Sequence, residues 1–361
     1  MIKPLTSLRF FFAFMIFVHH MTFLAKSKSP NLRWIHEFIL KEGYIGVSFF
    51  FILSGFILAY NYRDSIINKK TSKSNFYIAR IARIYPLHLL TLLIAVPLTL
   101  QNMNFEISLW LKQLLFNSTL TQSFIPIKKI YFSFNSPSWS ISTELFFYLM
   151  FPLIILLIAK LKNLKYNKSL LIPFLLLVPL LMLLVPPIYY KSLFYVNPFF
   201  RIFDFIVGIL LFELYFKIKN RERVINYNIL EFSSLVLLIV FFIFHRELPL
   251  VVRYSVYYWL PMSFLILVFS FQKGVLSKLL SNNTLILLGE ISFGFYMFHQ
   301  LVLKYFLQFN KLHLHIANEY YIISIILIVS LLISYMSLIW FENPVNKYLK
   351  RVLIKKPKGL S

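Results

Sequence analysis

The feature that most constrains this 361-residue chain is a succession of apolar segments, each long enough to cross a membrane as a helix. They lie at about 7–24, 43–61, 84–100, 139–159, 170–188, 197–217, 229–245, 253–271, 285–308 and 319–341. A helix of about 20 apolar residues crosses roughly 30 Å of hydrocarbon, where all backbone polar groups must bond internally. We therefore predict an all-α, polytopic membrane helix bundle with about ten transmembrane helices.

The composition agrees with this class, since 59% of the residues are hydrophobic and only 14% are charged. Soluble domains carry about 25% charged residues. The 8 glycines and the lack of two-residue alternation disfavour a β-barrel. No cysteine is present, which excludes disulfides, thiolate nucleophiles and zinc–cysteine sites. We expect no metal site.

The net charge of +24 does not indicate nucleic-acid binding, because the cations are spread over short loops between the apolar segments. They favour the segments at 62–83, 160–169 and 218–228 and the C-terminus, which predicts an N-in, C-in orientation. The stretch at 105–125 is too short to span and is predicted to be an interfacial helix. We expect one membrane domain, 1–350, followed by a basic cytoplasmic tail, 351–361.

Two polar residues in the first segment are unusual at membrane depth. Arg9 and His20 are eleven residues apart, close to three helical turns, so they share one face about 16 Å apart along the axis. Charged residues inside a membrane usually face a cavity or a substrate path. The alternative is that Arg9 extends to the interface or pairs with an acid, and that His20 packs against a neighbour.

Two arginines mark the predicted cytoplasmic entrance of the third segment. Arg80 and Arg83 are three residues apart, so they lie on one helix face. Two fixed guanidinium groups can bind phosphates bidentately. The alternative is an ordinary basic flank that only sets the orientation.

Further polar residues lie in the fourth and ninth segments. Ser140 and Glu144 are four residues apart, and an acid in such an apolar run is a functional candidate. The alternative is that Glu144 forms an ion pair with an intramembrane cation, namely Arg9, His20 or Arg201. The ninth segment places three polar side chains on one face: Ser292, Tyr296 and His299. On the predicted topology His20, Glu144 and His299 have similar depths, which predicts a shared polar cavity.

Two other patterns have a mainly structural interpretation. The second segment contains the small residues Gly43, Gly46, Ser54 and Gly55, which permit close helix packing or line a channel for an extended substrate. At the end of the tenth segment, Glu342 and Pro344 are interpreted as a helix stop.

Six motifs occur in order: LTSLRFFFAFMIFVHH, GVSFFFILSGFIL, ARIARIYP, SWSISTELFFY, GEISFGFYMFH and FENP. Together they resemble the bacterial acyltransferase-3 family of integral membrane O-acyltransferases, over about residues 5–350. The family's Arg-x10-His motif falls on Arg9 and His20, and His19 does not keep that spacing. Its Arg-x-x-Arg motif falls on Arg80 and Arg83, and its Ser-x-x-x-Glu motif on Ser140 and Glu144. Some members carry a fused extracytoplasmic domain; we expect this chain to be a stand-alone transferase.

The resemblance implies a multi-pass enzyme of the bacterial cytoplasmic (inner) membrane. The donor would be acetyl-CoA or another acyl-CoA, used as a co-substrate with no tightly bound cofactor. The acceptor would be a hydroxyl of a lipid-linked or cell-surface glycan, such as O-antigen, exopolysaccharide or capsule. The lipid bilayer would be its other partner, with no nucleic acid.

The same resemblance suggests roles for the candidate residues. Arg80 and Arg83 would bind the donor phosphates, and Arg9 would help to position the donor. His20 would act as the general base and Glu144 would orient its imidazole. An acyl-histidine intermediate is the alternative mechanism. Ser292, Tyr296 or His299 would polarise the thioester carbonyl.

A second class of function uses the same kinds of residue. A proton-coupled transporter or a flippase also places His, Glu and Arg inside a helix bundle. Transporters commonly contain internal repeats or broken helices, and the sequence indicates neither. We therefore favour the acyltransferase.

Overall fold

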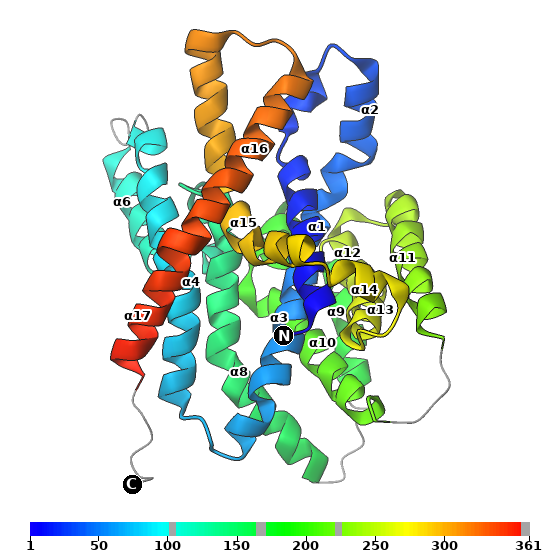
Figure 1. Ribbon diagram of the computed structural model, residues 1–361. Coiled ribbons are helices and arrows are strands. Elements are labelled where there is room, and N and C mark those ends of the chain that lie inside the picture. The colour runs from blue at the N-terminus through cyan, green and yellow to red at the C-terminus, as the bar shows by residue number, and fades with distance from the viewer. Residues whose placement is uncertain (101–105, 164–170, 221–225, 355–361) are drawn as a thin grey trace.

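The computed structural model describes residues 1–100, 106–163, 171–220 and 226–354, and these residues form helices with no strand (Figure 1). The all-α prediction is confirmed. Each of the ten apolar segments contains a helix: α1 Lys3–His19, α3 Gly46–Ile67, α4 Lys73–Ala95, α8 Trp139–Asn163, α9 Leu171–Leu184, α10 Pro198–Ile218, α11 Tyr227–Ile243, α13 Trp259–Ser270, α15 Asn283–Phe309 and α16 Glu319–Ser337.

Within the described residues, seven helical stretches are long and apolar enough to cross a membrane, or eight if a bent pair is one span. The number ten therefore remains a prediction. Two of the ten predicted spans account for most of the difference between ten and seven. Helix α10 contains Arg201, Asp204, Glu213 and Lys217 and is too charged by composition, while α13 has only 12 residues.

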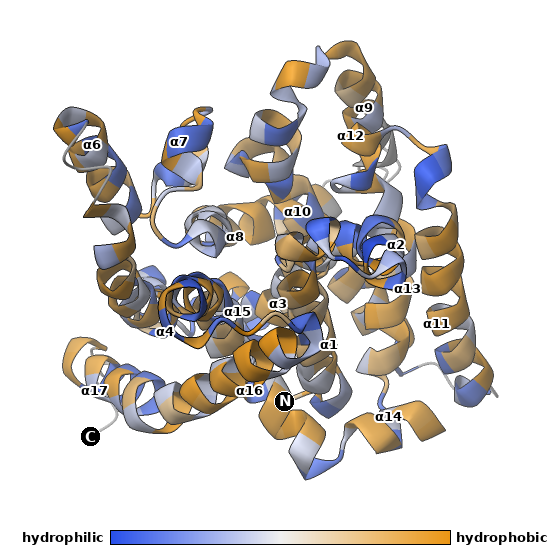
Figure 2. Ribbon diagram, turned by 90° about the horizontal axis from the view of Figure 1, so that it is seen from above, coloured by the Kyte–Doolittle hydropathy of each residue, from blue (hydrophilic) through white to orange (hydrophobic). Residues whose placement is uncertain are grey.

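The surface of the bundle is strongly apolar, as expected of a membrane protein. In Figure 2 the outward faces of α11 and α16 are hydrophobic. On α11, Phe232 and Val236 are more than half exposed, and on α16 the same is true of Ile328 and Leu332. Large side chains of this kind are stable on a surface that faces lipid.

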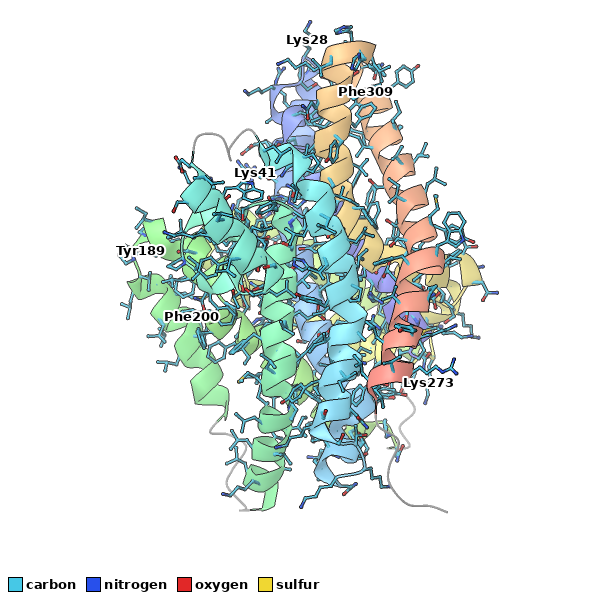
Figure 3. All side chains as sticks on the ribbon, turned by 90° about the vertical axis from the view of Figure 1, so that its left-hand side faces the viewer. Lys28, Lys41, Tyr189, Phe200, Lys273 and Phe309 are labelled. Atoms are coloured by element: carbon cyan, nitrogen blue, oxygen red, sulfur yellow. The ribbon has the colours of Figure 1, made fainter. Side chains whose placement is uncertain are left out.

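The two ends of the bundle agree with the predicted sidedness of the loops. The turn between α3 and α4 and the end of α17 (Asn343–Leu353) lie at one end of the molecule in Figure 1. Helix α2 (Pro30–Phe38) and the turn between α15 and α16 lie at the other. Figure 3 places Lys28 and Phe309 at this second end and Lys273 nearer the first. Which end faces the cytoplasm remains a prediction.

Some sequence predictions fall outside the described residues. These include Lys165, Lys168, Arg221 and Arg223, which contributed to the predicted orientation, and 355–361 of the predicted tail. The short helix expected within 105–125 is present as α6 (Ile107–Ser118), with Leu111 and Leu115 exposed.

One helix is broken, which the sequence analysis did not anticipate. The chain bends by 117° between Leu177–Leu184 and Pro187–Val196. Pro186 and Pro187 lie at the bend, and neither can donate the backbone hydrogen bond that would continue α9. This break does not border the cavity described below.

Helix α3 is central in the bundle and packs closely on α10 and α1. A side chain on Gly55 would collide with the backbone carbonyl of Phe205 in α10, and one on Gly208 would collide with that of Ile52. A side chain on Gly46 would also collide with the backbone carbonyl of Phe12 in α1, although this approach is less close. The glycines of this segment therefore serve close packing, as the first interpretation held.

Two helix ends differ from the predictions. Helix α4 begins at Lys73, where the Ser72 side chain caps it by accepting a hydrogen bond of 3.1 Å from Asn75 N–H. Arg80 and Arg83 therefore lie within the helix instead of before it. At the other end of the chain, the predicted stop at Glu342 is wrong. The helix passes through a π-turn, Leu338–Glu342, and continues as α17.

Candidate active site

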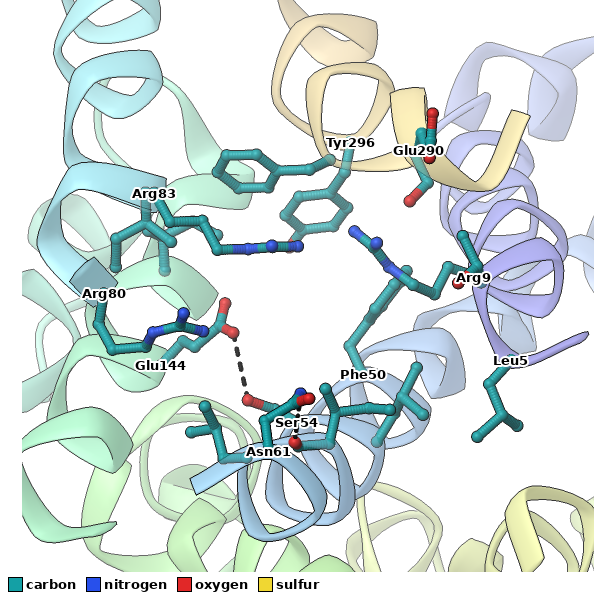
Figure 4. A pocket seen from close by; sticks show the side chains of 18 of the residues that line it. Leu5, Arg9, Phe50, Ser54, Asn61, Arg80, Arg83, Glu144, Glu290 and Tyr296 are labelled. Carbon is teal, nitrogen blue, oxygen red and sulfur yellow. Dashed lines mark hydrogen bonds between the residues drawn. The ribbon is translucent and has the colours of Figure 1, made fainter. Parts of the chain in front are cut away.

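A cavity of about 830 Å³ lies between α1, α3, α4, α8, α15 and the start of α17 (Figure 4). One face of α3 lines it from Val47 through Phe50, Ser54 and Ile57 to Asn61. These residues are three or four apart, as one helix face requires, and at 1.5 Å per residue they cover roughly 21 Å. The cavity is therefore long and narrow enough for an extended ligand.

Most of the residues singled out from the sequence meet in this cavity. Seven of them line it: Arg9, Arg80, Arg83, Ser140, Glu144, Ser292 and Tyr296. They come from four helices that are far apart in the sequence. His20 and His299 do not line it.

Arg9 and Arg83 are two cations of this cavity that lie within electrostatic range of the Glu342 carboxylate. Among the described residues neither makes a hydrogen bond or an ion pair, and their guanidinium groups point into the cavity from opposite walls (Figure 4). The two alternatives for Arg9, extension to the membrane interface and an ion pair with an acid, therefore do not describe the structure. Two unpaired guanidinium groups that face a shared space are suited to binding an anion.

Arg80 differs from Arg83 in being held by aromatic side chains. Its guanidinium donates a hydrogen bond of 2.8 Å to the Tyr62 hydroxyl and lies 5.0 Å from the centre of that ring. The ring of Tyr148 is 6.0 Å away on the other wall. Arg80 is thus fixed at the end of the cavity near the α3–α4 turn, whereas Arg83 remains free to bind a ligand.

Glu144 does not contact His20, so the prediction that it orients the imidazole is wrong. Its carboxylate accepts hydrogen bonds from Tyr148 (2.6 Å) and Ser54 (3.3 Å). Tyr148 is one helical turn further along α8, so both bonds keep the carboxylate on the cavity wall.

The ion-pair alternative for Glu144 is not seen either. Arg201 pairs instead with Asp204 at 2.8 Å, and both side chains are fully buried. Arg201 also donates to the Ser48 hydroxyl at 2.9 Å. These contacts tie α10 to α3 and lie apart from the cavity.

The end of the cavity away from the α3–α4 turn is closed by an aromatic layer. The Tyr296 hydroxyl lies 2.8 Å from Ser140 Oγ and 3.0 Å from the Pro137 carbonyl oxygen. The rings of Phe50 and Tyr296 are 6.2 Å apart between centroids. Ser292, one turn before Tyr296, donates instead to the Gly289 carbonyl at 2.7 Å and is not free to polarise a substrate.

Behind this layer lies a pair of hydrogen-bonded histidines. His20 Nδ1 is 2.9 Å from His299 Nε2, and His299 Nδ1 is 3.1 Å from the Phe295 carbonyl oxygen. The ring of Tyr296 is 5.9 Å from that of His299. The prediction of a shared site is therefore right for His20 with His299 and wrong for Glu144. One aromatic layer separates the two histidines from the cavity.

The bonding of the pair determines which nitrogens carry protons. A carbonyl oxygen can only accept, so His299 Nδ1 must donate to Phe295. The Nε2 atom of neutral His299 is then an acceptor, and His20 must donate to it through Nδ1. His20 Nε2 is left with a free lone pair, which is the form that a general base requires.

The sequence analysis missed several residues of the site. Tyr62 and Tyr148 hold Arg80 and Glu144, and Glu342 and Asn346 line the cavity from the π-turn and α17. The four-residue spacing of Glu144 and Tyr148 was a usable signal. Among the described residues, no group of His, Asp or Glu is arranged to hold a metal ion.

The fold and site are those of a helical membrane bundle with a cavity that contains guanidinium groups and a hydrogen-bonded histidine pair behind it. Comparison with known proteins identifies the family. Residues 4–340 match the acyltransferase domain family, so the chain belongs to that family. The resemblance to acyltransferase-3 proteins is thereby confirmed.

One curated relative is acyltransferase MdmB of Streptomyces mycarofaciens, which is 39% identical over 165 residues. The matched part covers 44% of this chain and 40% of that protein. No solved structure matches the chain.

Proposed function

We propose that this protein is a membrane O-acyltransferase that moves an acyl group from a cytoplasmic acyl-CoA to a hydroxyl of a lipid-linked or cell-surface glycan. Acetyl-CoA is the simplest donor. The observation that carries the proposal is the guanidinium groups of Arg9 and Arg83 in a long cavity that one aromatic layer separates from His20 and His299. The enzyme would act in the bacterial cytoplasmic membrane.

The proposed donor fits the shape and charge of the cavity. Its phosphates are anionic, and Arg80 and Arg83 lie toward the end of the cavity near the α3–α4 turn, which we predict to be cytoplasmic. Its pantetheine arm is extended and largely neutral, and the α3 face that borders the cavity is mostly apolar. A donor bound in this way directs its thioester toward Tyr296, whose hydroxyl is already bonded to Ser140 and to the Pro137 carbonyl.

The transfer itself requires one base. His20 Nε2 takes the proton of the acceptor hydroxyl as its oxygen attacks the thioester carbonyl carbon. The carbon–sulfur bond then breaks, and the imidazolium returns its proton to the leaving thiolate. His299 stabilises the imidazolium by accepting the His20 Nδ1–H bond, the role that the sequence analysis gave to Glu144. Attack by His20 Nε2 on the thioester, giving an acyl-histidine, uses the same free lone pair.

The test uses the purified full chain in lipid vesicles, with release of CoA from acetyl-CoA measured in the presence of glycan acceptors. Changing both Arg80 and Arg83 to Ala should raise the KM for acetyl-CoA about 10²- to 10⁴-fold, because two charge-assisted hydrogen bonds of about 1.5–3 kcal/mol each are lost. The KM for the acceptor should change little. Lys70→Gln is the matched control, because Lys70 is an exposed cation near the same end of the bundle and does not line the cavity.

Mass spectrometry of surface glycans, with and without the chain, would identify the acceptor by the acyl group that disappears. A wild-type protein that never releases CoA with any acceptor would refute the proposal. In that case, movement of protons or glycan lipids across the vesicle membrane would support the transporter alternative.

A further inference from the structure

We infer that one face of α17 recognises the nucleotide end of the donor, through Asn346 and Lys350. The inference rests on the proposed function and extends it to the part of the cavity that the family motifs do not cover. It concerns the helix that follows the predicted stop at Glu342.

The π-turn at Leu338–Glu342 determines which face of α17 borders the cavity. Asn343 and Asn346 both line the cavity, and Lys350 follows at the next position of the same face. Val352, two positions beyond Lys350, lies off this face and is exposed. Because π-turns recur at functional sites, a turn that places Asn343 and Asn346 on the cavity wall is consistent with ligand binding.

Asn346 has an unused hydrogen-bonding group in this wall. Its side-chain oxygen Oδ1 is buried and has no partner among the described residues. Buried polar groups nearly always have a partner, so the atom is expected to meet one when the cavity is filled. An amide offers both a donor and an acceptor, which suits a nucleobase edge or a ribose hydroxyl.

Lys350 adds a third cation at this end of the cavity. It lies within electrostatic range of both Arg80 and Arg83, so three like charges gather here, with the Glu342 carboxylate within range of Arg83. Such a cluster is unfavourable unless an anion binds it. An acyl-CoA carries three phosphates on its nucleotide, whereas its pantetheine arm carries none.

Phosphates could also come from lipid headgroups, because α17 carries cations beside an apolar face. The two sources are separated by a comparison of two donors. Acetyl-CoA contains the phosphorylated nucleotide, and acetyl-pantetheine lacks it. A lysine that binds lipid affects both donors equally, whereas one that binds the nucleotide affects only acetyl-CoA.

The experiment measures the KM of both donors for the full chain in vesicles of neutral phosphatidylcholine and in vesicles that also contain phosphatidylglycerol. Lys350→Gln and Asn346→Ala should each raise the KM for acetyl-CoA about tenfold in both lipids and leave that for acetyl-pantetheine unchanged. Arg351→Gln, which removes an exposed cation from the next position of the same helix, should change neither.

Equal effects on both donors, or an effect of Lys350→Gln that appears only with anionic lipid, would overturn this inference and leave the proposed function intact. A wild-type protein that uses neither donor would instead overturn the proposed function. The two failures are therefore distinguishable in a single set of measurements.

Discussion

The histidine pair makes the most specific prediction, which concerns His299. Replacing His299 by Phe keeps an aromatic ring in a fully buried position and removes the acceptor of the His20 Nδ1–H bond. His20 can then carry its proton on either nitrogen. When the proton is on Nε2, the atom that would act as the base has no free lone pair.

The expected magnitude follows from the one bond that is lost. When His20 is protonated during transfer, its bond to His299 joins a charged donor to a neutral acceptor, and such bonds contribute about 1.5–3 kcal/mol. Because about 1.4 kcal/mol is a factor of ten, His299→Phe should lower kcat about 10- to 100-fold. The KM for the donor should change little, since His299 does not line the cavity.

The assay is steady-state CoA release at saturating donor and acceptor, with two companion variants. His299→Gln retains an acceptor oxygen on a side chain of similar length and should recover part of the loss. His19→Gln is the matched control: the His19 ring lies 5.3 Å from that of His20, yet no hydrogen bond joins the two. A merely structural role for His299 predicts the same loss for Phe and Gln, and unchanged turnover in His299→Phe would refute the positioning argument.

Two further predictions concern the closing layer and the helix packing. Tyr296→Phe removes the hydroxyl that bonds to Ser140 and Pro137. It should raise acceptor-independent CoA release severalfold, because water gains access to the thioester. An unchanged ratio of hydrolysis to transfer would contradict this prediction. Gly55→Leu forces α3 away from the Phe205 carbonyl and should destabilise the protein by at least about 2 kcal/mol, seen as a lower melting temperature in detergent, with Gly55→Ala less affected.

Sequence patterns predicted the helices well because burial in lipid leaves few alternatives to a helix. They were less informative where a helix begins or ends inside the protein. Lys73 to Arg83 is polar enough to be taken for a loop, yet it continues α4 because its cap and its packing on α8 and α17 hold it. Glu342 and Pro344 suggested a stop, but a π-turn allows the helix to continue.

The sequence predicted which residues form the site, but it did not predict which of them contact one another. Helical spacing placed Arg9, Glu144 and Tyr296 on inward faces, and the structure brings them to one cavity. Depth alone could not decide between partners, because two residues at the same depth can lie on opposite sides of a bundle. Glu144 thus bonds within its own helix and to α3, while His299, named only as a supporting residue, is the partner of His20.

The separation between the cavity and the histidine pair has a chemical consequence. A thioester bound beside a general base is open to hydrolysis whenever water arrives before the acceptor. The proposed base, His20, lies behind Tyr296, whose hydroxyl is held by bonds to neutral groups, each worth about 0.5–1.5 kcal/mol. Rearranging that layer costs no more than a few kcal/mol, an amount that donor and acceptor binding can supply. If the proposed transfer takes place, we therefore expect this layer to open when both substrates are bound and to shield the thioester when only the donor is present.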